Sequence, residues 1–228
     1  MPLTGHGFRH QMSTRDYFDE LYRSESHYWW RHDVRYETQA SAFPFSLLTQ
    51  LTLRFLEDRP GQRVLDLGAG EGSDSIRLAL LGHDVSAVEI SKVGADKIRC
   101  FAAEVNVQVR VQVADLMTYQ PDGEFDLIIC NGVLHYIPDK AVVVDRMQAA
   151  TRPGGINVIS AWSTYTPVPE CHTVVPVYCD DEDGLITGRY APWITRLLYF
   201  EREKKESAHA DMQPHSHSHI KLIAQKPR

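Results

Sequence analysis

Cysteine is scarce in this chain, and the cysteines form no closely spaced pair. The four residues, Cys100, Cys130, Cys171 and Cys179, lie at irregular spacings without a C-x-x-C motif among 228 residues. Zinc ribbons and disulfide frameworks need such pairs or a dense set of cysteines, so neither is indicated. We expect reduced thiols and predict no metal site.

An excess of basic charge and long apolar runs are also lacking. A net charge of -6 and a pI near 6.0 argue against a protein that needs a broad basic surface for nucleic acid. No uncharged apolar run approaches the length of a membrane span, and the first residues lack the apolar core of a signal peptide. We expect a cytoplasmic globular protein without nucleic-acid or membrane partners, and 43% hydrophobic residues suffice for a large core.

An apolar run followed by alternating glycines is the main motif of the chain. Residues 63–72 read Arg-Val-Leu-Asp-Leu-Gly-Ala-Gly-Glu-Gly, which predicts a buried strand that turns sharply into a helix. Such turns bind nucleotide ligands at the helix N-terminus. Asp66 and Glu71 would repel a pyrophosphate, whereas S-adenosylmethionine offers them a sulfonium and an ammonium group. A purely structural turn is the alternative.

Strands and helices alternate through the middle of the chain. Strands are expected at 63–67, 84–90, 107–113, 123–130 and 156–162. Helices are expected from about residue 13 and over 45–58, 73–81, 91–104, 141–151 and 185–193. The alternation predicts an α/β fold with a doubly wound parallel sheet. Ligands of such sheets lie beyond the carboxyl ends of the strands.

An acid follows each of the second and third predicted strands. Glu89 lies 21 positions beyond Gly68, close to the roughly 20 at which an acid binds ribose hydroxyls in nucleotide-binding units. Asp115, between Ala114 and Leu116, can accept a hydrogen bond from the adenine amine while Leu116 packs on the ring. The alternatives are a solvent-facing charge for Glu89 and a helix cap for Asp115.

Three polar or reactive side chains follow the fourth predicted strand. Cys130, Asn131 and His135 are placed near the cofactor by the rule on strand ends. His135 has two interpretations, a pocket-lining group that could act as a base or a histidine packed beneath the next helix. We favour packing, because Val133 and Leu134 before it are apolar and no acid is apparent beside it.

The first 59 residues are predicted to form a helical segment that covers cofactor and substrate over a core at 60–228. Within this segment Tyr28, Trp29 and Trp30 stand together in a polar stretch, followed by Arg31. These aromatic side chains either anchor the segment by burial or cover a bound ligand whose carboxylate Arg31 binds.

The last third of the chain departs from the alternation. A proline-rich stretch at 164–183 predicts a loop over the ligand edge, and strands at 195–207 and 217–225 predict an antiparallel hairpin. His215, His217 and His219 share one face of the last strand. We expect them to line a substrate pocket or face solvent rather than chelate a metal, since no acid or cysteine shares their spacing.

Four motifs, taken together and in order, resemble class I S-adenosylmethionine-dependent methyltransferases. They are Val64-Leu-Asp-Leu-Gly-Ala-Gly-Glu-Gly72, Val88-Glu89-Ile90, Ala114-Asp115-Leu116 and Phe125-Asp-Leu-Ile-Ile-Cys130. The resemblance covers about residues 60–162 and implies a Rossmann-like seven-stranded sheet, mostly parallel with an antiparallel last strand and helices on both faces. It implies S-adenosylmethionine as cofactor, with Asp66, Gly68 and Gly70 at its methionine part, Glu89 at the ribose and Asp115 with Leu116 at the adenine. The full predicted cofactor set is Tyr28, Trp30, Arg31, Asp66, Gly68, Ala69, Gly70, Glu89, Ile90, Ala114, Asp115, Leu116, Cys130 and Asn131.

A looser resemblance links the chain to the tellurite-resistance methyltransferase group. It runs through Gly82-His-Asp-Val-Ser-Ala-Val-Glu-Ile-Ser91, residues 184–193 and the closing Ile220-Lys-Leu. In that group the final hairpin carries a histidine and an arginine near the substrate. His209 would match the histidine, but His219 stands where the arginine is expected, which argues against an oxyanion substrate.

We therefore expect methyl transfer to a small-molecule nucleophile, a thiol or other soft atom, or an oxygen or nitrogen of a metabolite. A thiolate needs no strong base, whereas a phenol or alcohol does, and the candidate bases are His135, His209, His217 and His219. A sensor or partner subunit that binds the cofactor without transfer is the alternative. An RNA or protein methyltransferase would call for a basic face or an added domain, and neither is apparent. The sequence does not indicate the oligomeric state.

Overall fold

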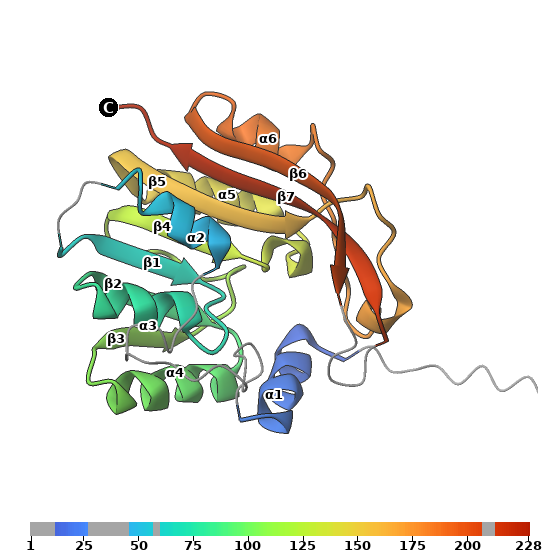
Figure 1. The fold of residues 1–228 in the computed structure, drawn as a ribbon, viewed down its shortest axis with the longest axis horizontal. Coiled ribbons are helices and arrows are strands. Elements are labelled where there is room, and N and C mark those ends of the chain that lie inside the picture. The colour runs from blue at the N-terminus through green and yellow to red at the C-terminus, as the bar shows by residue number, and fades with distance from the viewer. Residues whose placement is uncertain (1–11, 27–45, 57–59, 207–212) are drawn as a thin grey trace, which may run out of the picture.

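The computed structural model describes residues 12–26, 46–56, 60–206 and 213–228. A seven-stranded sheet runs through this part of the chain (Figure 1). Its strands are β1 (Arg63–Leu67), β2 (Asp84–Glu89), β3 (Val109–Val113), β4 (Phe125–Asn131), β5 (Thr151–Trp162), β6 (Ile194–Glu206) and β7 (His215–Gln225). They lie in the order β3-β2-β1-β4-β5-β7-β6, with β1 to β5 parallel and β7 antiparallel to both neighbours. The predicted Rossmann-like sheet with its antiparallel last strand is confirmed.

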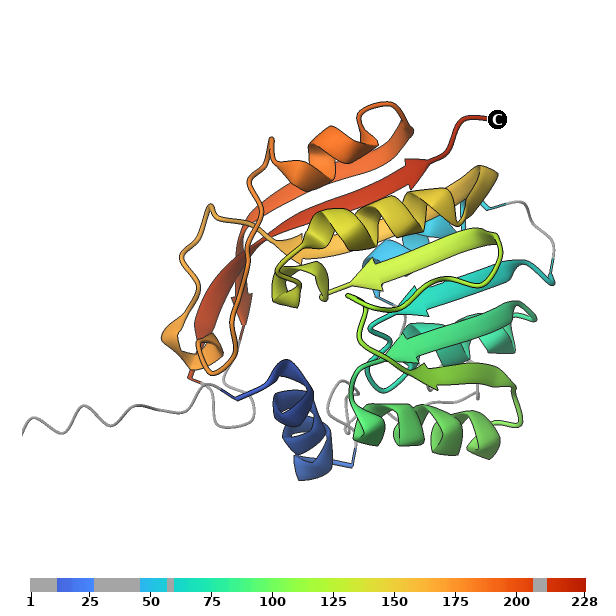
Figure 2. The same cartoon turned by 180° about the vertical axis from the view of Figure 1, so that it is seen from behind.

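Helices cover both faces of the sheet. On one face lie α2 (Leu47–Thr52), α3 (Ser73–Leu80) and α4 (Lys92–Glu104), which are in front in Figure 1. On the other lie α5 (Lys140–Ala149) and α6 (Leu185–Tyr190), in front in Figure 2. The central strands β1, β4 and β5 are largely buried on both sides, which explains why they read as continuous apolar runs rather than as alternating patterns.

Strand β1 illustrates how the two cores are divided. Val64 belongs to the cluster under α2 and α3, whereas Leu65 and Leu67 belong to the cluster under α5 and α6. Successive side chains of a strand point to opposite faces, so both layers receive apolar atoms from the same five residues. Asp66 is the buried polar residue of the strand, and it lies one position before Leu67, after which the glycine turn begins.

Helix α1 (Thr14–Ser24) packs against α4 beside the parallel half of the sheet (Figure 1). Ser13 caps it by accepting a hydrogen bond from Asp16 N, as its sequence predicts. Its Tyr22 is buried on Gly94, where an added Cβ would lie 3.0 Å from the tyrosine ring. Ser91 Oγ donates to Asp19 across the same contact at 2.5 Å. That the first 59 residues cover cofactor and substrate stays a prediction.

Two predicted elements differ most from the structure in their boundaries. The helix expected over 45–58 is the shorter α2, followed by tight turns at 53–56. Residues 152–155, which we expected to connect the helix over 141–151 to the strand over 156–162, are part of β5, because Thr151 pairs with Phe125 of β4 before a register shift in the ladder. Gly154 N–H also donates to Lys226 O at 3.0 Å, which holds this glycine in the sheet.

The described helices are all short. Among residues 12–26, 46–56, 60–206 and 213–228, no helix is long and apolar enough to cross a membrane.

Candidate active site

The glycine turn after β1 depends on residues without a side chain. Gly68, Gly70 and Gly72 have φ values of 69°, 59° and 83°, a left-handed conformation that other residues adopt only at a cost. Space is a second restriction, because an added Cβ at Gly68 would lie 2.3 Å from Val133 Cγ2 and one at Gly72 would lie 2.8 Å from Ile98 Cγ1. The turn is therefore packed tightly against both the β4 end and α4.

The backbone of this turn does not form a phosphate cradle. The N–H groups of Gly68 and Ala69 both donate to Val88 O, at 2.7 and 3.1 Å, and that of Gly70 donates to the Glu89 carboxylate at 2.8 Å. A pyrophosphate site needs such N–H groups directed at the ligand. The geometry supports the inference from the flanking acids that the ligand is not a dinucleotide.

Glu89 lies at the carboxyl end of β2 with 4% of its surface exposed. Its carboxylate accepts hydrogen bonds from Gly70 N–H at 2.8 Å and Ser91 N–H at 2.9 Å, one on each oxygen. Burial raises the pKa of the carboxyl group from 4.5 to about 7, although these two hydrogen bonds oppose the shift. Each carboxylate oxygen has two lone pairs, so both oxygens keep capacity for a ribose hydroxyl.

Asp66 is held by the first turn of α3. Ser75 Oγ donates to its carboxylate at 2.6 Å, and the side chain is buried. Burial, with a smaller contribution from the nearby negative charge of Asp74, raises the pKa of Asp66 from 3.8 to about 7. Two carboxyl groups with raised pKa values, Asp66 and Glu89, thus lie on either side of the glycine turn. A ligand with positive charge would favour their ionised forms.

The Glu71 carboxylate pairs with a lysine side chain of the protein. Its carboxylate is buried and pairs with Lys97 Nζ at 2.6 Å, and the same ammonium group donates to Glu25 O at 2.6 Å. This pair ties the glycine turn to α4 and to the end of α1. The negative charge of Glu71 is therefore compensated inside the protein.

The residues predicted at the adenine follow β3. Asp115 Oδ1 accepts from Met117 N–H at 2.8 Å, a cap-like contact that leaves its second oxygen available. Leu116 is buried in the cluster under α5, and Ala114 packs at its margin. Arg146 holds the loop by donating to Leu116 O at 3.1 Å, as well as to two carbonyls further along it. Their contact with adenine stays a prediction.

Cys130 and Asn131 end β4 but point to opposite layers. Cys130 is fully buried in the cluster under α5, where burial raises the pKa of its thiol. Asn131 Nδ2 faces the other layer and lies 3.1 to 3.2 Å from Ser46 Oγ, Thr49 Oγ1 and Asp74 Oδ2. Its Oδ1 is buried and accepts no hydrogen bond from the described residues, so one acceptor is left for a ligand.

His135 is packed in a stack of rings. Its imidazole lies parallel to the Trp162 ring with centroids 4.2 Å apart, and His217 covers the opposite face of the tryptophan at 4.1 Å. Trp162 N–H donates to His135 Nδ1 at 3.3 Å, so that nitrogen is unprotonated. Burial lowers the pKa of His135 well below its usual range. The histidine is therefore packed, here on Trp162 of β5, and its role as a base stays a prediction.

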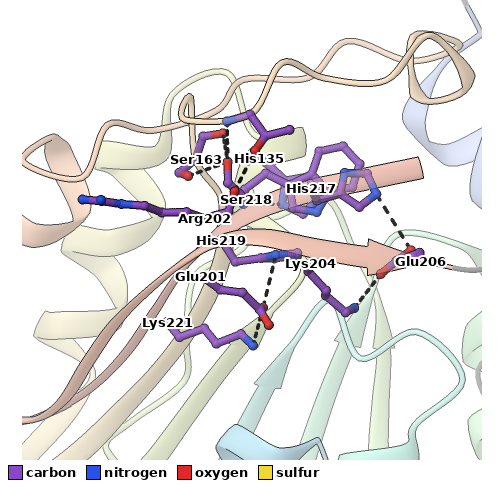
Figure 3. Close-up of polar contacts among 12 residues, drawn as sticks. His135, Ser163, Glu201, Arg202, Lys204, Glu206, His217, Ser218, His219 and Lys221 are labelled. Atoms are coloured by element: carbon purple, nitrogen blue, oxygen red, sulfur yellow. Dashed lines mark hydrogen bonds and ion pairs between the residues drawn. The ribbon is translucent and has the colours of Figure 1, made fainter. Parts of the chain in front are cut away.

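His217 and His219 of β7 lie beside acids of β6 (Figure 3). The antiparallel register sets Glu201 opposite His219 and Glu206 opposite His215. His219 Nδ1 is 3.6 Å from Glu201 Oε2, and His217 Nε2 is 3.8 Å from Glu206 Oε2. Burial lowers the pKa values of His217 and His219 from 6.5 to about 4, so both imidazoles are neutral at pH 7. These histidines therefore have carboxylate neighbours that their spacing in the sequence did not indicate.

His135, His215, His217 and His219 form a histidine cluster with Trp162. Sequence analysis did not indicate two further residues that lie in this cluster. Cys171 and His172 belong to a short 3-10 turn, Glu170–His172, in the proline-rich loop. His172 Nε2 lies 3.0 Å from His215 Nε2, and its ring also contacts Trp162. The contact joins positions 43 residues apart, and no local pattern could have indicated it.

Four predicted site residues lie outside the described residues. They are Tyr28, Trp30, Arg31 and His209. Their roles stay predictions.

The arrangement fits S-adenosylmethionine, because buried acids flank a turn whose N–H groups are used internally and Glu89 retains acceptor capacity. The fold and the strand-end motifs are those of the class I S-adenosylmethionine-dependent methyltransferases. The family described as "Methyltransferase domain" matches residues 36–223, so the chain belongs to that family. Its cofactor is S-adenosylmethionine.

Comparisons with individual proteins support this assignment. A ubiquinone biosynthesis O-methyltransferase of Xanthomonas campestris pv. campestris is 35% identical over 123 residues, 51% of each chain. The present chain thus spans about half the length of this curated relative. TehB from Haemophilus influenzae superposes with a TM-score of 0.69 at 19% identity, over 84% of this chain and 64% of the other. Magnesium protoporphyrin IX methyltransferase from Synechocystis PCC 6803, with bound SAH, gives 0.61 at 19%, over 93% and 97%.

Proposed function

We propose that this methyltransferase acts on a small molecule, at a thiol or other soft atom, or at an oxygen or nitrogen of a metabolite. The proposal rests on one observation: two different groups of side chains lie on the two halves of the carboxyl edge of the sheet. The buried acids lie near the carboxyl ends of β1 and β2, whereas the histidine cluster adjoins the ends of β4 and β5 and the start of β7. Cofactor and acceptor would meet between these halves, at the β1/β4 switch of the strand order.

On the first half, Glu89 and the glycine turn would hold the cofactor. S-adenosylmethionine, when bound, supplies a methyl group made electrophilic by the sulfonium. The chain would contribute position: Glu89 accepts from ribose hydroxyls, Gly68 and Gly70 permit close approach, and Asn131 Oδ1 offers a further acceptor. Charge attraction between a positively charged ligand and Asp66 would add to affinity.

On the second half, His219 is the base that we put first. Its Nδ1 lies 3.6 Å from the Glu201 carboxylate, which also pairs with Lys221 Nζ at 2.6 Å, so the negative charge of Glu201 can help to stabilise the imidazolium formed when an acceptor releases a proton. His135 is less suited, since its Nδ1 already accepts from Trp162 N–H. His217 is second, because its nearest carboxylate, Glu206, lies 3.8 Å away and also neighbours His215.

Because some curated relatives are named as O-methyltransferases, compounds with an acceptor oxygen are one class to be tested, although the similarity covers half of the chain. Labelled cofactor should be supplied with panels of thiols, phenols, amines and carboxylates, and the products read by mass spectrometry. We expect methylation in at least one panel. Cofactor binding without product in every panel would refute a small-molecule methyltransferase and favour a cofactor sensor.

The role of His219 is tested by comparing acceptors that do and do not carry a proton to be removed. His219→Gln should lower kcat for a phenol by about 100-fold or more, whereas a thiol supplied above its pKa should be methylated within a few-fold of the wild-type rate. His83→Gln, in the turn between α3 and β2, is the matched control. Equal losses with both acceptors would show that His219 supports the structure rather than proton transfer.

A further inference from the structure

Three potential metal ligands meet where the proline-rich loop touches the start of β7. Cys171, His172 and His215 each offer one donor atom, and these three atoms lie within 4.8 Å of one another. The nearest pair is His172 Nε2 and His215 Nε2, 3.0 Å apart. Both imidazoles are largely buried, with 8% of His172 and 6% of the His215 side chain exposed. The cluster is therefore built into the protein rather than spread over its surface.

The hydrogen bond at the other nitrogen of His215 fixes its tautomer. Nδ1 lies 2.7 Å from Gln213 O. A carbonyl oxygen only accepts, so Nδ1 must carry the proton and a neutral His215 keeps the lone pair of Nε2. Metal-binding histidines are oriented in this way, with the second nitrogen donating to a backbone carbonyl or a carboxylate. His215 thus presents its ligating nitrogen to the cluster before any ion arrives.

We propose that Cys171, His172 and His215 bind one Zn²⁺ ion. One thiolate with two imidazoles is a donor set that suits zinc, and three protein ligands leave a fourth position for water or a solute. At zinc–nitrogen distances of about 2.1 Å, two nitrogens of a tetrahedral site lie roughly 3.4 Å apart, so the observed 3.0 Å requires only a small shift. Binding would release the Cys171 thiol proton, and His172 would coordinate as the Nδ1–H tautomer.

A neighbouring acid defines the competing arrangement. Glu206 Oε2 is 3.5 Å from His215 Nε2, and Glu206, His215 and His217 form a second group of potential ligands that shares His215. The single lone pair of His215 Nε2 can serve one ion only. We assign it to the group that contains Cys171, because a thiolate selects zinc more strongly than a carboxylate does. Glu206 would then offset part of the charge of the ion from outside the ligand set.

The ion would link the proline-rich loop to the hairpin next to Trp162, whose ring lies 4.8 Å from that of His172. The same loop is also held by Ser163, which pairs with Asp180, by Thr166 N–H, which donates to Ser218 Oγ, and by Tyr178 N–H, which donates to His135 O at 2.6 Å. This inference does not depend on the identity of the acceptor or on transferase activity, because it concerns metal affinity alone.

The first test measures zinc affinity on the full chain after removal of metal with a chelator. Competition against a chromophoric chelator should give one tight Zn²⁺ per chain, and Cys171→Ser or His215→Gln should weaken binding by at least about 100-fold, more than is lost with an outer-shell partner. Cys179→Ser, in the same loop but outside both ligand groups, is the matched control and should bind as wild type does. Equal affinity in Cys171→Ser and wild type would overturn the proposal.

The second test uses the wild-type chain, so it does not depend on the folding of a variant. Stoichiometric Zn²⁺ should slow alkylation of Cys171 strongly while leaving the exposed Cys100 unaffected, as read by peptide mass spectrometry. Replacing Zn²⁺ with Co²⁺ should produce a thiolate-to-metal charge-transfer band. Unchanged alkylation of Cys171, or a Co²⁺ spectrum without that band, would exclude the thiolate as a ligand.

Discussion

Replacing Gly68 with alanine separates two costs that the glycine turn avoids. A left-handed φ of 69° costs a non-glycine residue about 1–2 kcal/mol. The added Cβ would also lie 2.3 Å from Val133 Cγ2, and such overpacking costs typically about 1–3 kcal/mol. We therefore expect Gly68→Ala to lower the free energy of unfolding by about 2–5 kcal/mol. Gly61→Ala, at φ 80° with nothing within 4 Å of its Cβ, should show the backbone cost alone, about 1–2 kcal/mol.

A double-mutant cycle isolates the overlap. In a Val133→Ala background both Cγ atoms are gone and the nearest remaining atom, Val133 Cβ, lies 3.2 Å from the new methyl group. Gly68→Ala should then cost no more than Gly61→Ala, a coupling of about 1–3 kcal/mol. Urea unfolding without cofactor, followed by tryptophan fluorescence, measures all four chains of the cycle. Equal costs of Gly68→Ala in the two backgrounds would refute the claim that the turn packs against the β4 end.

Two further predictions concern buried charges. Lys97→Ala removes the ammonium partner of the buried Glu71 and should lower the free energy of unfolding by about 2–4 kcal/mol. Lys92→Ala breaks an exposed pair on the same helix and should lower it by less than about 1 kcal/mol. Similar losses in the two variants would contradict the difference in burial between the two pairs. Because the pKa of Glu89 is raised from 4.5 to about 7, its proton stabilises the folded state below pH 4.5, and this contribution is lost as pH rises to about 7. The unfolding free energy of wild type relative to Glu89→Gln should therefore fall across that window, and a difference independent of pH would contradict the shift.

The parallel half of the fold was predictable because its information is local. The strand at 63–67, its glycine turn and the acid ending β2 lie within 27 consecutive residues, 63 to 89, and their spacing follows from the geometry of a β-α-β unit. The structure confirms these elements. It also shows two contacts that the motif does not indicate. Glu71 forms an ion pair with Lys97 on α4, and Asp66 accepts a hydrogen bond from Ser75 on α3.

The acceptor side could not be predicted to the same depth, because its contacts join distant segments. His135, Trp162, His172 and His217 are far apart in the chain, and the sheet order together with the loop brings their rings into contact. The sequence pattern did indicate that three histidines share one face of the last strand. That Glu201 would stand beside His219 depends on the hairpin register, which contains an irregularity between Glu201 and Lys204. Alternation alone does not specify such a shift.

The boundary errors have a physical cause as well. Proline and two glycines at 153–155 are typical of a turn, yet the chain continues along β4 by absorbing them in a register shift. Phe55 and Leu56 continue the helical spacing of α2, but the backbone there forms tighter turns. At 153–155 the pairing with β4 overrode the local preference for a turn.

Calorimetric titration with S-adenosylmethionine tests the central claim most directly, that this edge of the sheet holds the methyl donor through the acid ending β2. The chain should bind the cofactor, and Glu89→Ala should weaken binding by at least about 10-fold, because hydrogen bonds to a charged acceptor contribute about 1.5–3 kcal/mol each. Glu124→Ala, an exposed acid before β4, should bind as wild type does. No binding by the wild-type chain, or equal affinity in Glu89→Ala, would contradict the account.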